Sequence, residues 1–114
     1  MQFLVIGYDG KDEEAPARRQ AARPQHIALG HELMKNGNMW FGAALTDEDN
    51  NMVGSVLFMN FPSRAELKEW LKREPYIKDG VWESYEVKVC SVRDPWLFSQ
   101  PREYYEDATK HDHE

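Results

Sequence analysis

The sequence is poor in cysteine and has no long apolar run. Cys90 is the single cysteine among 114 residues, so no disulfide can form within the chain and no metal site can be built from several thiolates. Cys90 lies in a strand-like segment, where a lone cysteine is usually a small packed residue. No apolar stretch approaches the ~20 residues that a transmembrane helix needs. We therefore expect no membrane contact.

Clustered basic charge is missing as well. The chain has 14 basic and 20 acidic residues, which gives a formal net charge of -6. Nucleic-acid binding relies on a basic patch or stripe, whereas the one local cluster, Arg18, Arg19 and Arg23, follows an acidic run at 12–14. We expect no nucleic-acid partner, although a small anionic ligand stays compatible with this charge.

Targeting and cofactor signatures are also absent. Residues 2–6 read as a strand and not as the basic and apolar regions of a secretory signal, so the expectation is a cytoplasmic protein. The sequence shows no glycine-rich phosphate loop, nucleophile elbow or dinucleotide fingerprint, and we expect no cofactor. We also expect no metal, because His26 and His31 lie about 140° apart around a helix and His111 and His113 sit in a polar tail.

Hydrophobic patterning predicts the order strand, helix, strand, strand, helix, strand. The strands are expected at 3–8, 38–45, 52–61 and 81–92, and the helices at about 16–36 and 63–73. This is the order of a ferredoxin-like α+β domain (βαββαβ), in which helices pack on one face of an antiparallel sheet. The other sheet face must be polar, covered by the tail or paired with a second subunit.

Local signals predict how the helices begin and end. Pro24 should break or kink the first helix near Arg23, and Gly37 should end it. Ser63 should cap the second helix, and a loop is expected at 76–80.

The chain divides into a domain at 1–93 and a C-terminal extension at 94–114. Trp96 and Phe98 in the extension are expected to pack on the same or a neighbouring subunit, and the last residues are expected to fray.

His26 is the leading candidate for chemistry. On the first helix, Ala22, Leu29 and Leu33 form an apolar stripe that His26 interrupts. The histidine should then point toward the sheet or a cleft. Periodicity alone is equally compatible with a buried structural histidine and with a general acid or base, for which an imidazole is well suited.

Several motifs in order resemble those of YCII-related (YciI-like) proteins. They are Arg23-Pro24-Gln25-His26 with Leu29, then Gly37, Phe41-Gly42-Ala43, Gly54-Ser55, Trp70, Glu74-Pro75-Tyr76 and Gly80-Val81. The resemblance implies a dimeric α+β barrel, a homodimer in which two sheets pack face to face. It also implies a cleft in which the helix histidine meets an acidic residue from an Asp-Pro-Tyr motif. One branch of the family resembles a dehydrochlorinase acting on a chlorinated hydroxyhydroquinone, and the wider superfamily includes isomerases and cofactor-free monooxygenases.

This chain departs from the family pattern at Glu74, where aspartate is usual. Glutamate keeps the charge but moves the carboxylate, and catalytic geometry is sensitive to such shifts. Glu74 is either a partner of His26 or a solvated carboxylate at a helix end.

Four further residues are candidates for ligand contact. Arg23 could bind a carboxylate or phenolate or form a surface ion pair. Ser55 could face the cleft or the opposite side of the sheet. Trp40 and Tyr76, with Phe41, could line an apolar pocket for a ring, although such aromatics more often belong to the core.

Two functions follow from these residues. In the first, the protein is a cofactor-independent enzyme, a lyase, isomerase or dehydrochlorinase, in which His26 and Glu74 move a proton on an aromatic or lactone-like substrate. In the second, the same cleft binds or senses a small metabolite without turnover.

Overall fold

The computed structural model describes residues 1–94, 96 and 100–107. Within these residues the elements are β1 (Gln2–Asp9), α1 (Ala15–Lys35), β2 (Met39–Thr46), β3 (Met52–Asn60), α2 (Arg64–Arg73), α3 (Pro75–Lys78), β4 (Trp82–Cys90) and α4 (Arg102–Glu106). None of the helices in this described part is long and apolar enough to cross a membrane.

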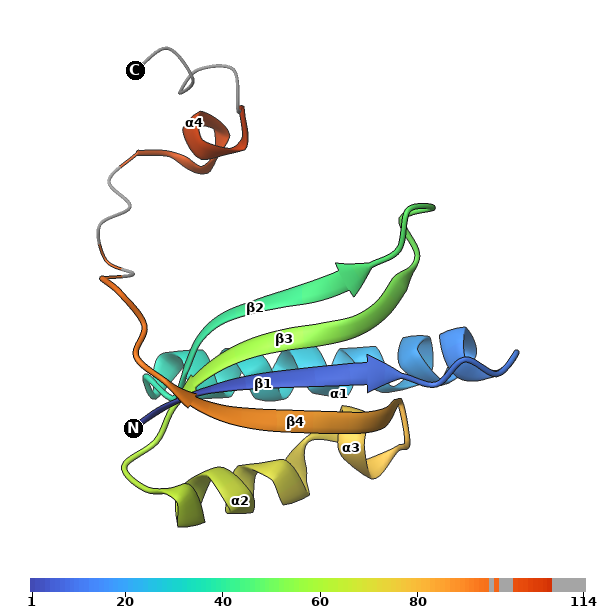
Figure 1. Cartoon of the computed structure of the whole chain (residues 1–114), viewed down its shortest axis with the longest axis horizontal. Helices are drawn as coiled ribbons and strands as arrows, with labels where there is room; N and C mark the ends of the chain where they lie inside the picture. Colours follow the sequence, from blue (N-terminus) through green and yellow to red (C-terminus); the bar gives the residue numbers. More distant parts are fainter. Residues whose placement is uncertain (95, 97–99, 108–114) are drawn as a thin grey trace.

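The strands form one antiparallel sheet in the order β2-β3-β1-β4. β1 is central, and its Val5 lies opposite Leu57 of β3 and Val87 of β4. α1 runs behind the sheet, and α2 and α3 follow beside it (Figure 1). The predicted ferredoxin-like α+β architecture is confirmed.

The core lies between this sheet and the helices. Alternate residues of β1 and β3 point toward the helices and are almost fully buried, as in Phe3, Val5 and Met59. The helices contribute apolar residues at helical spacing, Ala22, Leu29 and Leu33 from α1 with Leu67 and Trp70 from α2. The predicted stripe on α1 therefore faces the sheet.

α1 is continuous from Ala15 to Lys35, so of the predicted break or kink near Arg23 the break is wrong. Pro24 lies inside the helix, on its exposed side. There, water can satisfy the carbonyl that has lost its helical donor. Gly37 ends the helix as predicted, with φ of +75°. The amides of Gly37 and Asn38 bond back to the carbonyls of Met34 and Leu33, which is the Schellman arrangement.

The second helical region holds one confirmed prediction and one error. Ser63 caps α2 by accepting a hydrogen bond from the Glu66 amide at 3.3 Å. Residues 75–78, however, form the short helix α3 and not a loop. Glu74 supplies the cap of α3 with its side chain, and Pro75 occupies the first helical turn, where its missing N–H costs nothing. This local geometry turns the Glu74 carboxylate inward.

The second face of the sheet, the open face, is left uncovered by α1, α2 and α3. Residues that alternate with the core positions lie on it. On β1, β2 and β3 they are largely apolar, namely Leu4, Ile6, Phe41, Val56 and Phe58, whereas edge strand β4 places Ser84, Glu86 and Lys88 there. The extension begins beyond β4, where Trp96 packs edge-to-face on Trp40 with ring centroids 5.3 Å apart. Phe98, His111 and His113 lie outside the described residues.

Candidate functional site

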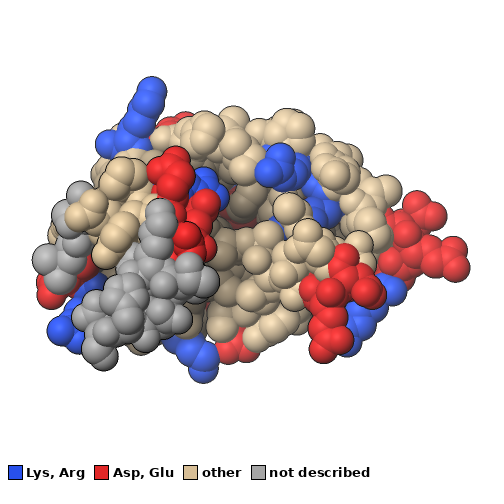
Figure 2. Space-filling view, turned by 90° about the horizontal axis from the view of Figure 1, so that it is seen from above, with Lys and Arg blue, Asp and Glu red and all other residues tan. Residues whose placement is uncertain are grey.

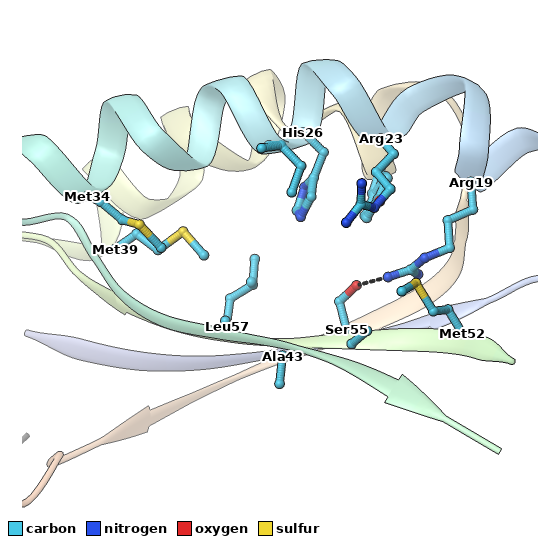
Figure 3. Close-up of a pocket in the computed structure, with 13 residues that line it drawn as sticks. Arg19, Arg23, His26, Met34, Met39, Ala43, Met52, Ser55 and Leu57 are labelled. Carbon is cyan, nitrogen blue, oxygen red and sulfur yellow. Dashed lines mark hydrogen bonds between the residues drawn. The ribbon is translucent and has the colours of Figure 1, made fainter. Parts of the chain in front are cut away.

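A cavity of about 210 Å³ lies between α1 and the β2–β3 half of the sheet. α1 contributes Arg19, Arg23 and His26, β3 contributes Ser55, and α3 contributes Tyr76. Figure 3 shows His26 and Arg23 pointing down from the helix and Ser55 pointing up from the strand. The molecular surface is hollowed near the middle of the face in Figure 2, and basic side chains border the hollow.

His26 and Glu74 are in direct contact. The Nδ1 atom of His26 lies 2.5 Å from Oε1 of Glu74, and both side chains are largely buried. The same carboxylate oxygen accepts the Tyr76 amide at 3.2 Å. An ionised carboxylate only accepts hydrogen bonds, so when the imidazole is neutral its proton is on Nδ1. The lone pair is then on Nε2, the nitrogen that Glu74 leaves free.

Tyr76 holds the plane of the imidazole. The two rings are stacked, with centroids 3.9 Å apart and planes 11° from parallel. The Arg19 guanidinium also lies over the Tyr76 ring, 4.8 Å from its centroid. Burial raises the pKa of the Tyr76 phenol. The ring is thus a neutral platform beside His26, and the imidazole has little freedom to rotate.

Arg19, Asp9 and Ser55 form a second buried polar cluster. Its Nη1 donates to both carboxylate oxygens of Asp9 at 3.0 and 2.9 Å, and its Nη2 donates to Ser55 Oγ at 3.2 Å. Trp82 Nε1 donates to the same Ser55 oxygen at 3.3 Å. Both members of the Arg19–Asp9 pair are less than a tenth exposed. Such a pair is held rigidly, because separating it would leave a buried charge alone.

The remaining lining divides into a charged side and an apolar side. Arg23 is exposed, and no described residue forms a hydrogen bond or ion pair with it. Met34, Met39 and Leu57 form much of the apolar side (Figure 3). Methionine adapts its shape to an apolar partner, while the guanidinium of Arg23 attracts an anion. The cavity therefore suits a small molecule with one apolar and one anionic end.

Most of the residues singled out in the sequence meet in this cavity. His26, Arg23, Ser55 and Tyr76 line it, and Glu74 touches His26 from behind. The structure does not bring Trp40 there: it lies at a register shift of β2, its Nε1 donates to the Gly37 carbonyl, and its ring packs on Trp96.

The sequence reasoning missed Arg19 and Asp9. In the sequence Arg19 belongs to a local basic cluster with Arg18 and Arg23, yet it lies at the helical spacing that Ala15, Ala22 and His26 share. That spacing was the available signal. For Asp9 the signal was its place at the end of the first strand, but a lone aspartate there equally reads as a turn residue.

The described residues contain no group of three or more histidine, cysteine, aspartate or glutamate side chains placed to hold a metal ion. What the cavity offers is proton chemistry: a histidine oriented by a carboxylate, next to several hydrogen-bond donors.

The sequence of this chain is similar to a known protein family and to two known proteins. A family model described as the YCII-related domain matches residues 1–91. Protein YciI of Escherichia coli O6:H1 is 26% identical over 94 residues, which cover 77% of this chain and 94% of that protein. Protein YciI of Shigella flexneri matches to the same extent.

Solved structures share the fold. The 5-chloro-2-hydroxyhydroquinone dehydrochlorinase of Burkholderia phenoliruptrix, in complex with 2,5-dihydroxybenzoquinone, matches with a TM-score of 0.69 at 22% identity, over 80% of this chain and 94% of that one. A dimeric ferredoxin-like protein of unknown function from Jannaschia matches with a TM-score of 0.52 at 13% identity, over 80% of this chain and 98% of that one.

Proposed function

The chain belongs to the YCII-related domain family, and we propose that it is a cofactor-independent enzyme that moves a proton on a small ring-shaped substrate. His26 is the general base and acid, and Glu74 orients it. Arg23, Ser55 and Tyr76 form the binding site. Elimination and isomerisation suit such a site, since both need a positioned base and little bulk water.

The observation that carries this proposal is the contact between His26 and Glu74. The hydrogen bond at Nδ1 leaves Nε2 to the ligand, and the Tyr76 stack restrains the ring. A structural histidine needs neither an open cavity beside it nor a buried carboxylate behind it. The arrangement follows the general logic in which a third group orients a catalytic base.

The size and lining of the cavity support a small ring as the proposed substrate. At about 210 Å³ it is smaller than the roughly 300–1,000 Å³ of sites for drug-sized ligands, so a single ring is appropriate. The apolar side and the free charge of Arg23 favour a ring that carries an anionic oxygen. The bound dihydroxybenzoquinone of the Burkholderia dehydrochlorinase is a molecule of this class, and lactones are a second class.

The alternative function is binding or sensing of a similar metabolite without turnover. Two observations favour it. Glutamate replaces the family's usual aspartate at position 74, and the lining described here contains no carboxylate and no second imidazole. A reaction that needs separate acid and base groups would then be slow.

Proton exchange distinguishes the two functions without knowledge of the natural substrate. The protein is incubated in D₂O with a panel of hydroxylated quinones, cyclic enones and small lactones, the ring panel, and each C–H signal is followed by proton NMR. An enzyme that removes a ring proton will replace it with deuterium even when no net reaction occurs. Binding alone will broaden the signals and leave their intensities unchanged.

Two variants of α1 make the result specific. His26→Asn should lose about 100-fold or more of the exchange rate, the range expected for a positioned base. His31→Asn, at an exposed histidine on the same helix, should keep it. Exchange that survives in His26→Asn would refute the catalytic role. Ligand binding without exchange in the wild-type protein would establish the alternative.

We also propose that the protein is a homodimer through its open face. Leu4, Ile6, Val56 and Phe58 place apolar side chains there, and none of the helices described lies over them (Figure 1). A domain this small gains much from covering such a surface with a second copy. The fold relative from Jannaschia is described as dimeric.

A further inference from the structure

The hydroxyl of Ser55 has an unused donor. A serine hydroxyl offers two acceptor positions and one donor. Arg19 Nη2 and Trp82 Nε1 both donate to Ser55 Oγ, at 3.2 and 3.3 Å, and so fill the acceptor positions. No described residue accepts a hydrogen bond from Ser55. Because the residue is only 2% exposed and lines the cavity, an acceptor bound in the cavity would satisfy its O–H.

Arg19, which donates to Ser55, also has an unused donor. Its Nη atoms are occupied by Asp9 and Ser55, whereas its Nε is buried and has no hydrogen-bond partner. Unpaired buried donors are rare and costly, and each one calls for an explanation. Arg19 also lines the cavity. A ligand atom that accepts from both Arg19 and Ser55 would relieve both groups.

Among the residues described, this corner of the cavity offers donors and no free acceptor. With both acceptor positions of Ser55 filled, the remaining polar groups are the O–H of Ser55 and, directly beside it, the guanidinium of Arg19. Arg23 adds a further cationic donor to the lining. Asp9 neutralises Arg19 from behind, so the positive charge of Arg23 stays uncompensated in the lining described. An ammonium or an alcohol donor would find no partner here, while an oxyanion would find several.

We propose that Ser55 and Arg19 form an oxyanion site that holds the substrate's oxygen while His26 removes a proton from the neighbouring carbon. Asp9 is a positioning residue that fixes Arg19. This inference deepens the proposed function and rests on it: it assigns the substrate to compounds with a carbonyl oxygen, including the keto form of a phenol, next to the reacting C–H.

The step balances within the site. The C–H bond breaks, and its proton forms a bond with Nε2 of His26. The electron pair of that C–H bond becomes the C=C bond of an enolate, and the C=O π pair moves to the oxygen held by Ser55 and Arg19. Return of the proton to another carbon completes an isomerisation, or loss of a leaving group with its bonding pair completes an elimination. Donors aimed at the developing charge commonly contribute a large part of such catalysis.

The oxyanion site can be tested without turnover, using 4-nitrophenol as the probe. Its phenolate absorbs visible light and the neutral phenol does not, so a pH titration of the bound probe gives its apparent pKa. Hydrogen bonds to the charged form favour that form, and wild-type protein should lower the pKa of the bound probe. Ser55→Ala should weaken phenolate binding about 10- to 100-fold and leave binding of the neutral phenol nearly unchanged.

Matched variants keep this test decisive. Ser84→Ala removes an exposed serine of β4 on the open face and should behave as wild type. Should Ser55→Ala not fold, Arg19→Lys keeps the charge next to Asp9 but removes Nε, and it should show the same selective loss. If the wild-type protein does not prefer the phenolate over the neutral phenol, the oxyanion site is refuted. It is also refuted if Ser55→Ala keeps the same preference as wild type.

Different results would contradict the catalytic role of His26 and the oxyanion site. His26→Asn should keep the phenolate preference, because the probe's oxygen is held by Ser55 and Arg19. If that variant retains both the preference and the exchange of ring-panel protons, the oxyanion site stands and the role of His26 falls.

Discussion

The Nδ1 atom of His26 lies 2.5 Å from the Glu74 carboxylate, although the two residues are 48 positions apart. Three local features bring them together. The apolar stripe of α1 turns His26 toward the sheet, Pro75 begins α3 directly after Glu74, and the Tyr76 amide holds the carboxylate. The orientation of the His26 ring thus depends on a helix cap.

This contact predicts the tautomer of His26. With Glu74 ionised, the neutral ring should carry its proton on Nδ1. Glu74→Gln should lose this preference, because an amide can donate as well as accept. Nitrogen NMR of uniformly labelled protein, at a pH where the ring is neutral, reads the two nitrogens directly, and exposed His31 is an internal control. Protonation of wild-type His26 at Nε2 would contradict the arrangement.

The buried pair of Arg19 and Asp9 predicts a large stability effect. Asp9→Ala leaves the Arg19 charge buried without its partner, which should cost about 3–5 kcal/mol in the free energy of unfolding. Asp12→Ala, which removes the exposed ion pair with Arg18, should cost far less. Urea unfolding measures both. Equal losses in the two variants would show that the buried pair contributes no more to the free energy of unfolding than the exposed pair.

Tyr76 predicts a loss of stability at alkaline pH. Burial raises the pKa of its phenol, so the folded chain holds that proton more tightly than the unfolded chain. The resulting stabilisation is complete below pH of about 10, the ordinary phenol value, and is lost as pH rises through the raised pKa. In Tyr76→Phe the free energy of unfolding should fall less steeply with alkaline pH. Urea unfolding between about pH 8 and 11 measures this dependence.

The control for that measurement is Tyr85→Phe, which removes an exposed phenol on β4. It should leave the alkaline slope close to that of wild type. An equal flattening in both variants would mean that the slope does not come from Tyr76.

The local signals in the sequence predicted most of the fold. Gly37 and Ser63 mark helix ends through backbone geometry and a side-chain cap, and both act within a few residues. The break predicted at Pro24 was wrong because packing of α1 on the sheet compensates for one lost hydrogen bond. Helix propensity alone does not include this tertiary contribution.

The site was less accessible from sequence. Contact between His26 and Glu74 is set by tertiary structure, and only the family resemblance suggested it. Arg19 is buried because Asp9 pairs with it, a relationship that composition hides, since an isolated arginine reads as a surface residue. Trp40 was expected in the pocket, but the register shift in β2 places it beside Trp96.

The open face predicts the oligomeric state. Wild-type protein should have the mass of a dimer by light scattering at micromolar concentration. Phe58→Glu places a charge in the apolar patch of β3 and should give a folded monomer, because burial of an unpaired charge is strongly unfavourable. Lys72→Glu, at an exposed position of α2, should remain dimeric. A monomeric wild-type protein would contradict the proposed homodimer.

The most direct test of the central claim is a double-mutant cycle on proton exchange in the ring panel. His26→Asn, Glu74→Gln and the double variant are compared with wild type. If Glu74 acts only by orienting His26, the double variant should be no slower than His26→Asn alone, because groups that work as a unit are not additive. Independent, multiplicative losses in exchange rate, or an unchanged rate in Glu74→Gln, would contradict the account.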